Sequence, residues 1–277
     1  MENNWKDVLA RSEHSDDLEK LLENERNRRV QHSGRYFYYY PPSGGRPAIL
    51  SGLLPALAAA FWPRASEYGA KASKKLTAGP KARGIAKSAG GSIRGSEVHG
   101  QIDDFVHLSV DLFKKKHARV HPYLKRLVKN VFYPRNWTPV ESEFKLFDEE
   151  TGIGTAVDVV CVDERGVLHA LEIKTGYETN WNVAEGAMEG PFSNLLSDSP
   201  RDRAAVQVLF ELILIAKHHK VRQVEGWVVH ITDANIVQFE IGRELRRLAL
   251  DAYRYLAAER VLTKIERSEK RRDARVK

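Results

Sequence analysis

Cysteine is nearly absent from this sequence. Its 277 residues include one cysteine, Cys161, which excludes an intramolecular disulfide framework and a zinc site built from cysteines. Cys161 lies between Val160 and Val162 in an apolar run, so we interpret it as a small core residue. A chain without disulfides is typical of a reducing, intracellular compartment, and the sequence does not distinguish cytoplasm, nucleus and organelle.

Long apolar runs are also missing. The best candidate for a membrane span, residues 48–62, is interrupted by Gly52 and Pro55 and is too short to cross a bilayer. The first residues, Met1–Asp7, contain no apolar secretory core, and they carry too many acids for a typical transit peptide. We therefore expect neither a membrane partner nor a targeting segment.

Acidic residues are missing from the stretch 71–94, which contains seven lysines and arginines and many small residues. The whole chain carries a formal net charge of +7, which favours a polyanionic partner. Two main interpretations of this basic stretch remain open. It is either a solvated flexible loop, or a loop that contacts nucleic-acid phosphates through Lys74, Lys75 and Lys81; a localisation signal is a third reading.

The chain is long enough to bury a full core, and its patterns divide it into three parts. Residues 1–94 are expected to form an N-terminal helical and aromatic extension that ends in the basic loop 71–94. Residues 95–265 are expected to form the core, and 266–277 a charged tail. The extension is predicted to contain a helix over 15–30, an extended segment over 35–40 and a buried helix over 49–62.

The core pattern alternates helices with strand-like runs. A long helix over 96–116, capped by Ser96, and a short basic helix over 122–130 come first. The predicted strands are 140–147, 155–160, 168–174 and 226–232, and the predicted later helices are 199–218, which opens at Ser199-Pro200, and 240–265. This order, αβββαβ, predicts an α/β (α+β) fold in which helices flank a mixed central sheet, with a further C-terminal helix.

Three charged residues interrupt the second and third strands of the core. Asp158 lies in the run 155–160, and Glu172 and Lys174 lie in the run 168–174. Side chains on a strand alternate between its faces, so Glu172 and Lys174 point the same way, and a hairpin would bring Asp158 beside them. Two carboxylates and one ammonium group among apolar residues are costly for stability alone, and they suit a divalent metal and a phosphodiester.

The order and spacing of these residues resemble the PD-(D/E)xK nuclease superfamily, whose core is αβββαβ, although Val157 replaces the proline of the motif. The G-x-x-x-H pattern of Gly95–His99 and a glutamine, Gln207, on the helix after the third strand are similar to the RecB-type and lambda-exonuclease-like branch. Glu211 departs from that branch, which usually has tyrosine there. The resemblance covers about 95–232, and 35–95 loosely resembles phage and mitochondrial genome maintenance exonucleases.

The resemblance implies a metal-dependent deoxyribonuclease, specifically an exonuclease of replication, recombination or repair. It implies Mg²⁺, with Mn²⁺ as a substitute, held by His99, Asp158, Glu172 and the carbonyl of Ile173. Lys174 would then stabilise negative charge on the phosphate, and Gln207 would orient the lysine, a water or a phosphate. Arg203 shares a helix face with Gln207, which makes it a candidate phosphate contact.

Several alternatives remain open. The chain could be a catalytically inactive nuclease-fold module that binds DNA or acts as a scaffold, or a restriction-type endonuclease. His99 could be an ordinary packed helix residue, with Glu97 and Asp103 as rival ligands, and Gln207 could be a surface residue. Glu143, on the strand 140–147, could either support the metal site or face solvent.

Overall fold

The computed structural model describes residues 30–33, 36–40, 47–62, 83–177, 179–219, 221 and 223–261. The predictions for the helix 15–30, for Lys74, Lys75 and Lys81, and for the tail 266–277 lie outside these residues. Within them, no helix combines the length and the apolar character that a membrane span requires.

The described strands form one mixed sheet of eight strands. Its order is β1-β2-β3-β5-β6-β7-β8, and β4 pairs with the other edge of β5. The β3–β5 and β6–β7 pairs are parallel and the others are antiparallel. The bounds are β1 Val30–Ser33, β2 Tyr36–Tyr39, β3 Ala48–Gly52, β4 Thr138–Asp148, β5 Ile153–Val162, β6 Leu168–Thr175, β7 Val224–Ile231 and β8 Ile236–Glu240.

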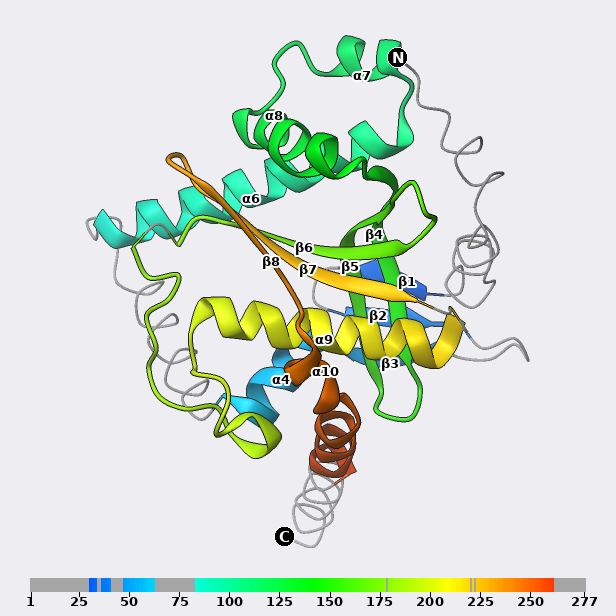
Figure 1. Cartoon of the computed structure of the whole chain (residues 1–277), viewed down its shortest axis with the longest axis vertical. Helices are drawn as coiled ribbons and strands as arrows, with labels where there is room; N and C mark the ends of the chain where they lie inside the picture. The colour runs from blue at the N-terminus through cyan, green and yellow to red at the C-terminus, as the bar shows by residue number, and fades with distance from the viewer. Residues whose placement is uncertain are drawn as a thin grey trace, which may run out of the picture.

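Helices cover both faces of this sheet (Figure 1). On one side lie α6 (Arg83–His107), α7 (Val110–Lys116) and α8 (Pro122–Leu127), followed by the helical turns η1 (Val128–Phe132) and η2 (Tyr133–Arg135). On the other side lie α4 (Leu53–Phe61), α9 (Pro200–His219), α10 (Arg243–Arg247) and the helical residues 249–261. Each side has its own buried apolar cluster. The predicted αβββαβ order, and with it the α/β fold class, is confirmed.

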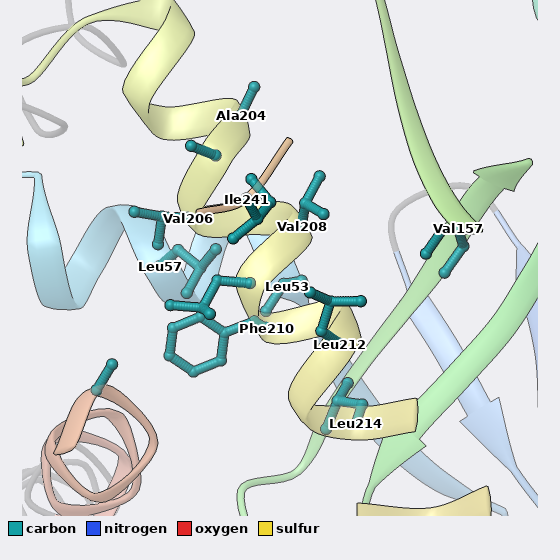
Figure 2. Close-up of a cluster of buried hydrophobic side chains, with 14 of the residues drawn as sticks. Leu53, Leu57, Val157, Ala204, Val206, Val208, Phe210, Leu212, Leu214 and Ile241 are labelled. Atoms are coloured by element: carbon teal, nitrogen blue, oxygen red, sulfur yellow. The ribbon is translucent and has the colours of Figure 1, made fainter. Parts of the chain in front are cut away.

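Helix α9 is the central element of one of these layers because apolar residues occupy most of its circumference. Figure 2 shows Leu53 and Leu57 of α4 beside Phe210 of α9. On the sheet side, α9 lies so close to β7 that a Cβ added at Gly226 would be 2.6 Å from Val208 Cγ1. The predicted cap is also confirmed, since the Ser199 hydroxyl accepts a hydrogen bond from the Asp202 amide at 3.2 Å.

The β5–β6 hairpin is closed by the turn that its sequence predicts. The Gly166 amide donates to the Asp163 carbonyl at 3.0 Å, and Gly166 has a positive φ of 77°. The Asp163 carboxylate also accepts hydrogen bonds from the Arg165 and Val167 amides, both at 2.9 Å. The turn therefore fixes the register that pairs Val159 with Leu171.

Three predicted helix boundaries are wrong. The predicted helix 96–116, with Ser96 as its cap, instead begins at Arg83 and is interrupted between α6 and α7, where Ser109 caps the second helix. Residues 83–94 of the predicted basic loop are therefore helical. The predicted buried helix 49–62 is wrong at its start. Residues 48–52 form strand β3, because they pair with β2 and β5, and α4 follows at Leu53. The predicted helix 240–265 begins later, after the unforeseen strand β8.

The described parts of the extension 1–94 extend the central sheet and add a small aromatic cluster of their own. The predicted extended segment 35–40 is confirmed as β2. Phe37 packs so closely on β5 that a Cβ at Gly154 would be 2.7 Å from the phenylalanine Cβ, which explains why glycine is needed there. The division of the chain into 1–94, 95–265 and 266–277 stays a prediction.

Candidate metal centre in the strand fork

Strands β5 and β6 separate at the position of the predicted motif. Their ladder ends at the pair Val159–Leu171, and beyond it β6 continues to pair with β7 up to Thr175. The Asp158 carboxylate lies in the resulting fork, where its Oδ2 accepts a hydrogen bond from the Ile173 amide at 2.6 Å. The fork therefore leaves room for a polar site between two strands that are otherwise apolar.

Glu143 enters the fork from the neighbouring strand β4. The register passes from Ser142–Val159 to Phe144–Val157, so Glu143 lies opposite Asp158. Its φ of 48° is in the left-handed region, which is uncommon for a residue other than glycine within a strand. Such a conformation costs about 1–3 kcal/mol and concentrates at functional sites.

His99 reaches the same point from helix α6. Its Nδ1 lies 3.3 Å from Glu143 Oε1 and 3.4 Å from Asp158 Oδ1. The three residues each offer one ligand atom, and these atoms lie within 4.8 Å of one another, so the group can hold a metal ion. His99 of the helix and Asp158, the first residue of the motif, thus lie together, and Glu143 lies with them.

Electrostatics shows that this group has a surplus of negative charge. Burial and the nearby Glu172 carboxylate together raise the pKa of Asp158 to about 8, against the opposing effects of His99 and Lys174. Burial alone would lower the pKa of His99, but the charges of Asp158 and Glu143 outweigh it and raise that pKa to about 9. A cation at this point would relieve both effects, because it would stabilise the carboxylates directly.

Glu172 and Lys174 form an ion pair on one face of β6, as their alternation predicts. The Lys174 ammonium group donates to Glu172 Oε1 and, at 3.1 Å, to Gln207 Oε1 on α9. Burial opposes the charge on Lys174, but Glu172 and Asp158 outweigh burial and raise the pKa of the ammonium group above its ordinary value. Lys174 is therefore a permanent cation, held by two acceptors beside the proposed metal group.

Gln207 is in turn held by Glu211, one helical turn further along α9. The amide Nε2 of Gln207 donates to Glu211 Oε1 at 3.0 Å, and the Thr155 hydroxyl donates to the same oxygen at 3.4 Å. Because the amide nitrogen is engaged by Glu211, the amide oxygen faces Lys174. Burial, followed by repulsion from Glu172, raises the pKa of Glu211 well above its ordinary value.

Two carboxylate oxygens of this region are buried without a hydrogen-bond partner among the described residues: Glu172 Oε2 and Glu211 Oε2. Glu172 is 3% exposed and Glu211 is fully buried, so bulk water does not satisfy these oxygens. We call the set His99, Glu143, Asp158, Glu172, Lys174, Gln207 and Glu211 the fork site. Three of its acids, Asp158, Glu172 and Glu211, are buried, and donors among the described residues satisfy them only partly.

The other predicted site residues are not part of this set. Arg203 Nε donates to the buried Asp198 carboxylate at 2.5 Å, and the guanidinium group lies 5.1 Å from the centre of the Trp62 ring. A phosphate would have to share this guanidinium with Asp198, and the Arg203 contact stays a prediction, as does the metal-ligand role of the Ile173 carbonyl. The rival ligand Asp103 contacts Ser142 and His107 instead.

Glu143 and Glu211 are the residues that sequence reasoning did not assign. Nothing in a strand pattern predicts the left-handed backbone that turns Glu143 into the fork. The four-residue spacing of Glu211 from Gln207 indicates that both lie on one face of the helix, but a carboxylate on a helix is usually solvated. Its burial follows from the apolar surroundings of α9, which only the folded chain reveals.

Comparisons with known proteins assign no family. No family model matches the chain, and no curated protein matches it. Among solved structures, the crystal structure of SSO0001 aligns with a TM-score of 0.37 and 16% identity, over 94% of this chain and 86% of that one. A "Putative exonuclease" from Eubacterium rectale aligns with a TM-score of 0.35 and 12% identity, over 60% of this chain and 67% of that one. Similarity at this level carries no functional conclusion.

Proposed function

We propose that this protein is a metal-dependent deoxyribonuclease that hydrolyses phosphodiester bonds at the fork site, and that it acts as an exonuclease in DNA replication, recombination or repair. The observation that carries the proposal is the convergence of His99, Glu143 and Asp158 beside the Glu172–Lys174 ion pair. Two of these groups come from a strand fork and one from a helix, so the arrangement depends on the tertiary fold. An ion pair on the protein surface would not require a helix and two strands to converge in this way.

The donor set fits a divalent cation. Mg²⁺ and Mn²⁺ prefer oxygen ligands, which Asp158, Glu143 and Glu172 supply, and a neutral His99 would add one nitrogen. Glu172 Oε2, which has no donor among the described residues, supports this fit, because a buried carboxylate oxygen without a donor is costly. A cation held here would supply a polarised water at neutral pH and would offset charge on the phosphate.

Lys174 supplies the second positive charge. Its ammonium group is fixed by Glu172 and Gln207, so it can stabilise negative charge that builds on a phosphate without first being reoriented. Gln207 positions the lysine, and Glu211 positions Gln207. These roles agree with the resemblance to the PD-(D/E)xK superfamily, and the RecB-like features, His99 and Gln207, are what favour a DNA end as the substrate.

One experiment tests this function. Labelled linear DNA and covalently closed circular DNA are incubated with the protein in Mg²⁺, in Mn²⁺ and after exhaustive chelation. We expect loss of the linear DNA only when metal is present, with the closed circle spared. Cleavage of the closed circle would indicate an endonuclease, and the absence of any metal-dependent cleavage would favour a non-catalytic module.

A further inference from the structure

A second acid-free segment, distinct from the one at 71–94, lies within the described fold. Residues 112–140 contain no aspartate or glutamate, and they carry eight lysines and arginines: Lys114, Lys115, Lys116, Arg119, Lys125, Arg126, Lys129 and Arg135. They form most of α7, then α8, η1, η2 and the first residues of β4. Figure 1 shows α7 and α8 on the α6 side of the sheet, so this charge is concentrated on one side of the molecule.

Three of the eight cations have structural partners. Lys116 pairs with Asp104 at 2.7 Å, Arg126 donates to the Thr232 carbonyl, and Arg135 donates to Gln238 and stacks on two tryptophan rings. The remaining five are exposed and have no side-chain partner among the described residues: Lys114, Lys115, Arg119, Lys125 and Lys129. We call these five residues the basic face.

The basic face is held on a rigid support. On the inner side of the same helices Phe113, Leu124, Leu127 and Val131 are buried in the apolar cluster beneath α6. Lys125 and Lys129 are four residues apart and exposed, opposite these buried positions. The packing of these helices therefore fixes the backbone positions from which the cations extend.

The segment that carries the basic face is also hydrogen-bonded to α6, the helix that supplies His99 to the fork site. Gln101, two residues after His99 on α6, accepts a hydrogen bond from the His121 amide at 2.7 Å and donates to the Arg119 carbonyl at 3.4 Å. These bonds hold the α7–α8 connection against α6. The five residues of the basic face therefore belong to the same layer as His99, a proposed metal ligand.

We propose that the basic face binds the phosphodiester backbone of the nucleic acid whose scissile bond lies in the fork site. This inference rests on the proposed function. Five exposed cations without partners in the described part of the chain, in a segment without acids, match the regular negative charge of a nucleic-acid backbone. Tyr133 is 73% exposed at the end of the same helical run, and its ring is available to stack on an unpaired base.

The test is the salt dependence of binding to a labelled oligonucleotide in EDTA, where cleavage does not interfere. Each phosphate contact contributes about 0.7 to the log–log slope for a single strand and about 0.9 for a duplex. The variant Lys125→Ala/Lys129→Ala should therefore flatten the slope by about 1.4 to 1.8. Lys114→Ala/Lys115→Ala tests the other helix in the same way.

The matched control is Arg247→Ala/Arg254→Ala, which removes two exposed arginines from the helices on the opposite side of the sheet. It should leave the slope unchanged. An unchanged slope in both basic-face variants, or an equal change in the control, would overturn the proposal. A membrane surface is the alternative partner. It would replace nucleic acid in the proposal if wild-type protein bound phosphatidylserine vesicles more tightly than the oligonucleotide at the same salt, and if the basic-face variants lost this vesicle binding.

Hydrolysis of a small phosphodiester, bis(p-nitrophenyl) phosphate, separates this proposal from the proposed function. The basic-face variants should keep wild-type hydrolysis of this substrate in Mn²⁺, because it is too small to reach the basic face. If wild-type protein hydrolyses neither DNA nor the small ester but the slope still falls in the variants, the basic face stands and the nuclease function fails.

Discussion

Two buried charged clusters lie along helix α9, and they are built in opposite ways. One is the fork site, beside Gln207 and Glu211. The other surrounds Asp148 at the end of β4, and it includes Glu150, Thr151, Lys217, His218 and Tyr253; we call it the Asp148 cluster. Both contain carboxylates that are almost fully buried, and they differ in how those carboxylates are satisfied.

Asp148 is satisfied completely. Its Oδ1 receives hydrogen bonds from Lys217 at 2.8 Å and His218 at 3.0 Å, and its Oδ2 receives one from the Tyr253 hydroxyl at 2.8 Å and two from Thr151. Burial alone would raise the pKa of Asp148, but these donors outweigh burial and hold it far below its usual range. The cluster joins β4, α9 and the C-terminal helix, so its role is structural.

The fork-site acids have fewer donors among the described residues, and the pKa values of two of them shift the other way. The pKa values of Asp158 and Glu211 are raised, and Glu172 Oε2 and Glu211 Oε2 have no partner among the described residues. Donors within the protein satisfy the Asp148 carboxylate, whereas buried acids with raised pKa values are typical of functional sites. The contrast predicts that matched substitutions in the two clusters will have opposite effects on activity and stability.

The largest expected effect is on activity in the fork site. Lys174→Ala removes a fixed cation from the reacting phosphate, so DNA cleavage should fall by at least roughly a hundredfold. The matched substitution Lys217→Ala in the Asp148 cluster should leave the cleavage rate per folded molecule unchanged. Single-turnover cleavage rates measure both, and a wild-type rate in the Lys174 variant would remove the fork site from catalysis.

The second effect is on stability in the Asp148 cluster. Asp148→Asn removes the buried carboxylate that accepts hydrogen bonds from Lys217, His218, Tyr253 and Thr151, and the unfolding free energy should fall by roughly 3 kcal/mol. Urea denaturation measures this change. Asp158→Asn is the matched fork-site variant, and it should keep or increase the stability of the metal-free protein because burial disfavours the charged form of this carboxyl. Equal losses in both variants would contradict the contrast between the clusters.

A smaller effect concerns Glu211, which positions Gln207. Glu211→Leu removes the acceptor for the Gln207 amide, so cleavage should fall by about tenfold, the equivalent of one hydrogen bond. Glu211→Gln keeps an acceptor and should restore most of the rate. The melting temperature should not fall in Glu211→Gln, because the amide keeps the acceptor and burial disfavours the charged form of the carboxyl that it replaces. If Glu211→Leu loses stability and keeps its rate, Glu211 is merely structural.

The smallest effect is a pair of opposite pH dependences. The folded pKa of Asp148 is below its ordinary value of 3.8, so its stabilisation is present above about pH 4 and is lost as the pH falls further. The folded pKa of Glu211 is above its ordinary value of 4.5, so the native state holds a proton that the unfolded chain releases, and stability declines as the pH rises above 4.5.

Urea denaturation of wild type, Asp148→Asn and Glu211→Gln between pH 3 and 8 measures both slopes. The stability difference between wild type and Asp148→Asn should shrink below about pH 4. The difference between wild type and Glu211→Gln should shift in favour of the variant as the pH rises. Curves that stay parallel across this range would show that neither carboxyl titrates differently in the folded protein.

The sequence predicted those features that depend on neighbouring residues. Strand alternation gave the common face of Glu172 and Lys174, the turn chemistry of Asp163–Gly166 gave the hairpin, and Ser199-Pro200 gave the start of α9. Each of these patterns depends only on neighbouring residues, so it can be recognised without knowledge of the rest of the fold. The motif residues could therefore be identified before their surroundings were known.

Features that depend on distant partners could not be predicted. Residues 48–52 form a strand only because β2 and β5 pair with them, and β8 depends in the same way on β7. The separation of β5 from β6 is what opens the fork, and no pattern in either strand marks it. Glu143 enters the site through a backbone conformation that its residue type disfavours, so sequence alone left its role open.

The central claim is that the fork site holds a divalent cation, and calorimetric titration with Mn²⁺ tests it most directly. Wild-type protein should bind Mn²⁺, and Asp158→Asn and His99→Ala should each weaken binding by at least about tenfold, the equivalent of one lost ligand. Glu150→Gln, which changes an exposed carboxylate of the Asp148 cluster, should bind like wild type. Equal affinities in all four folded proteins, or no binding to wild type, would contradict the account.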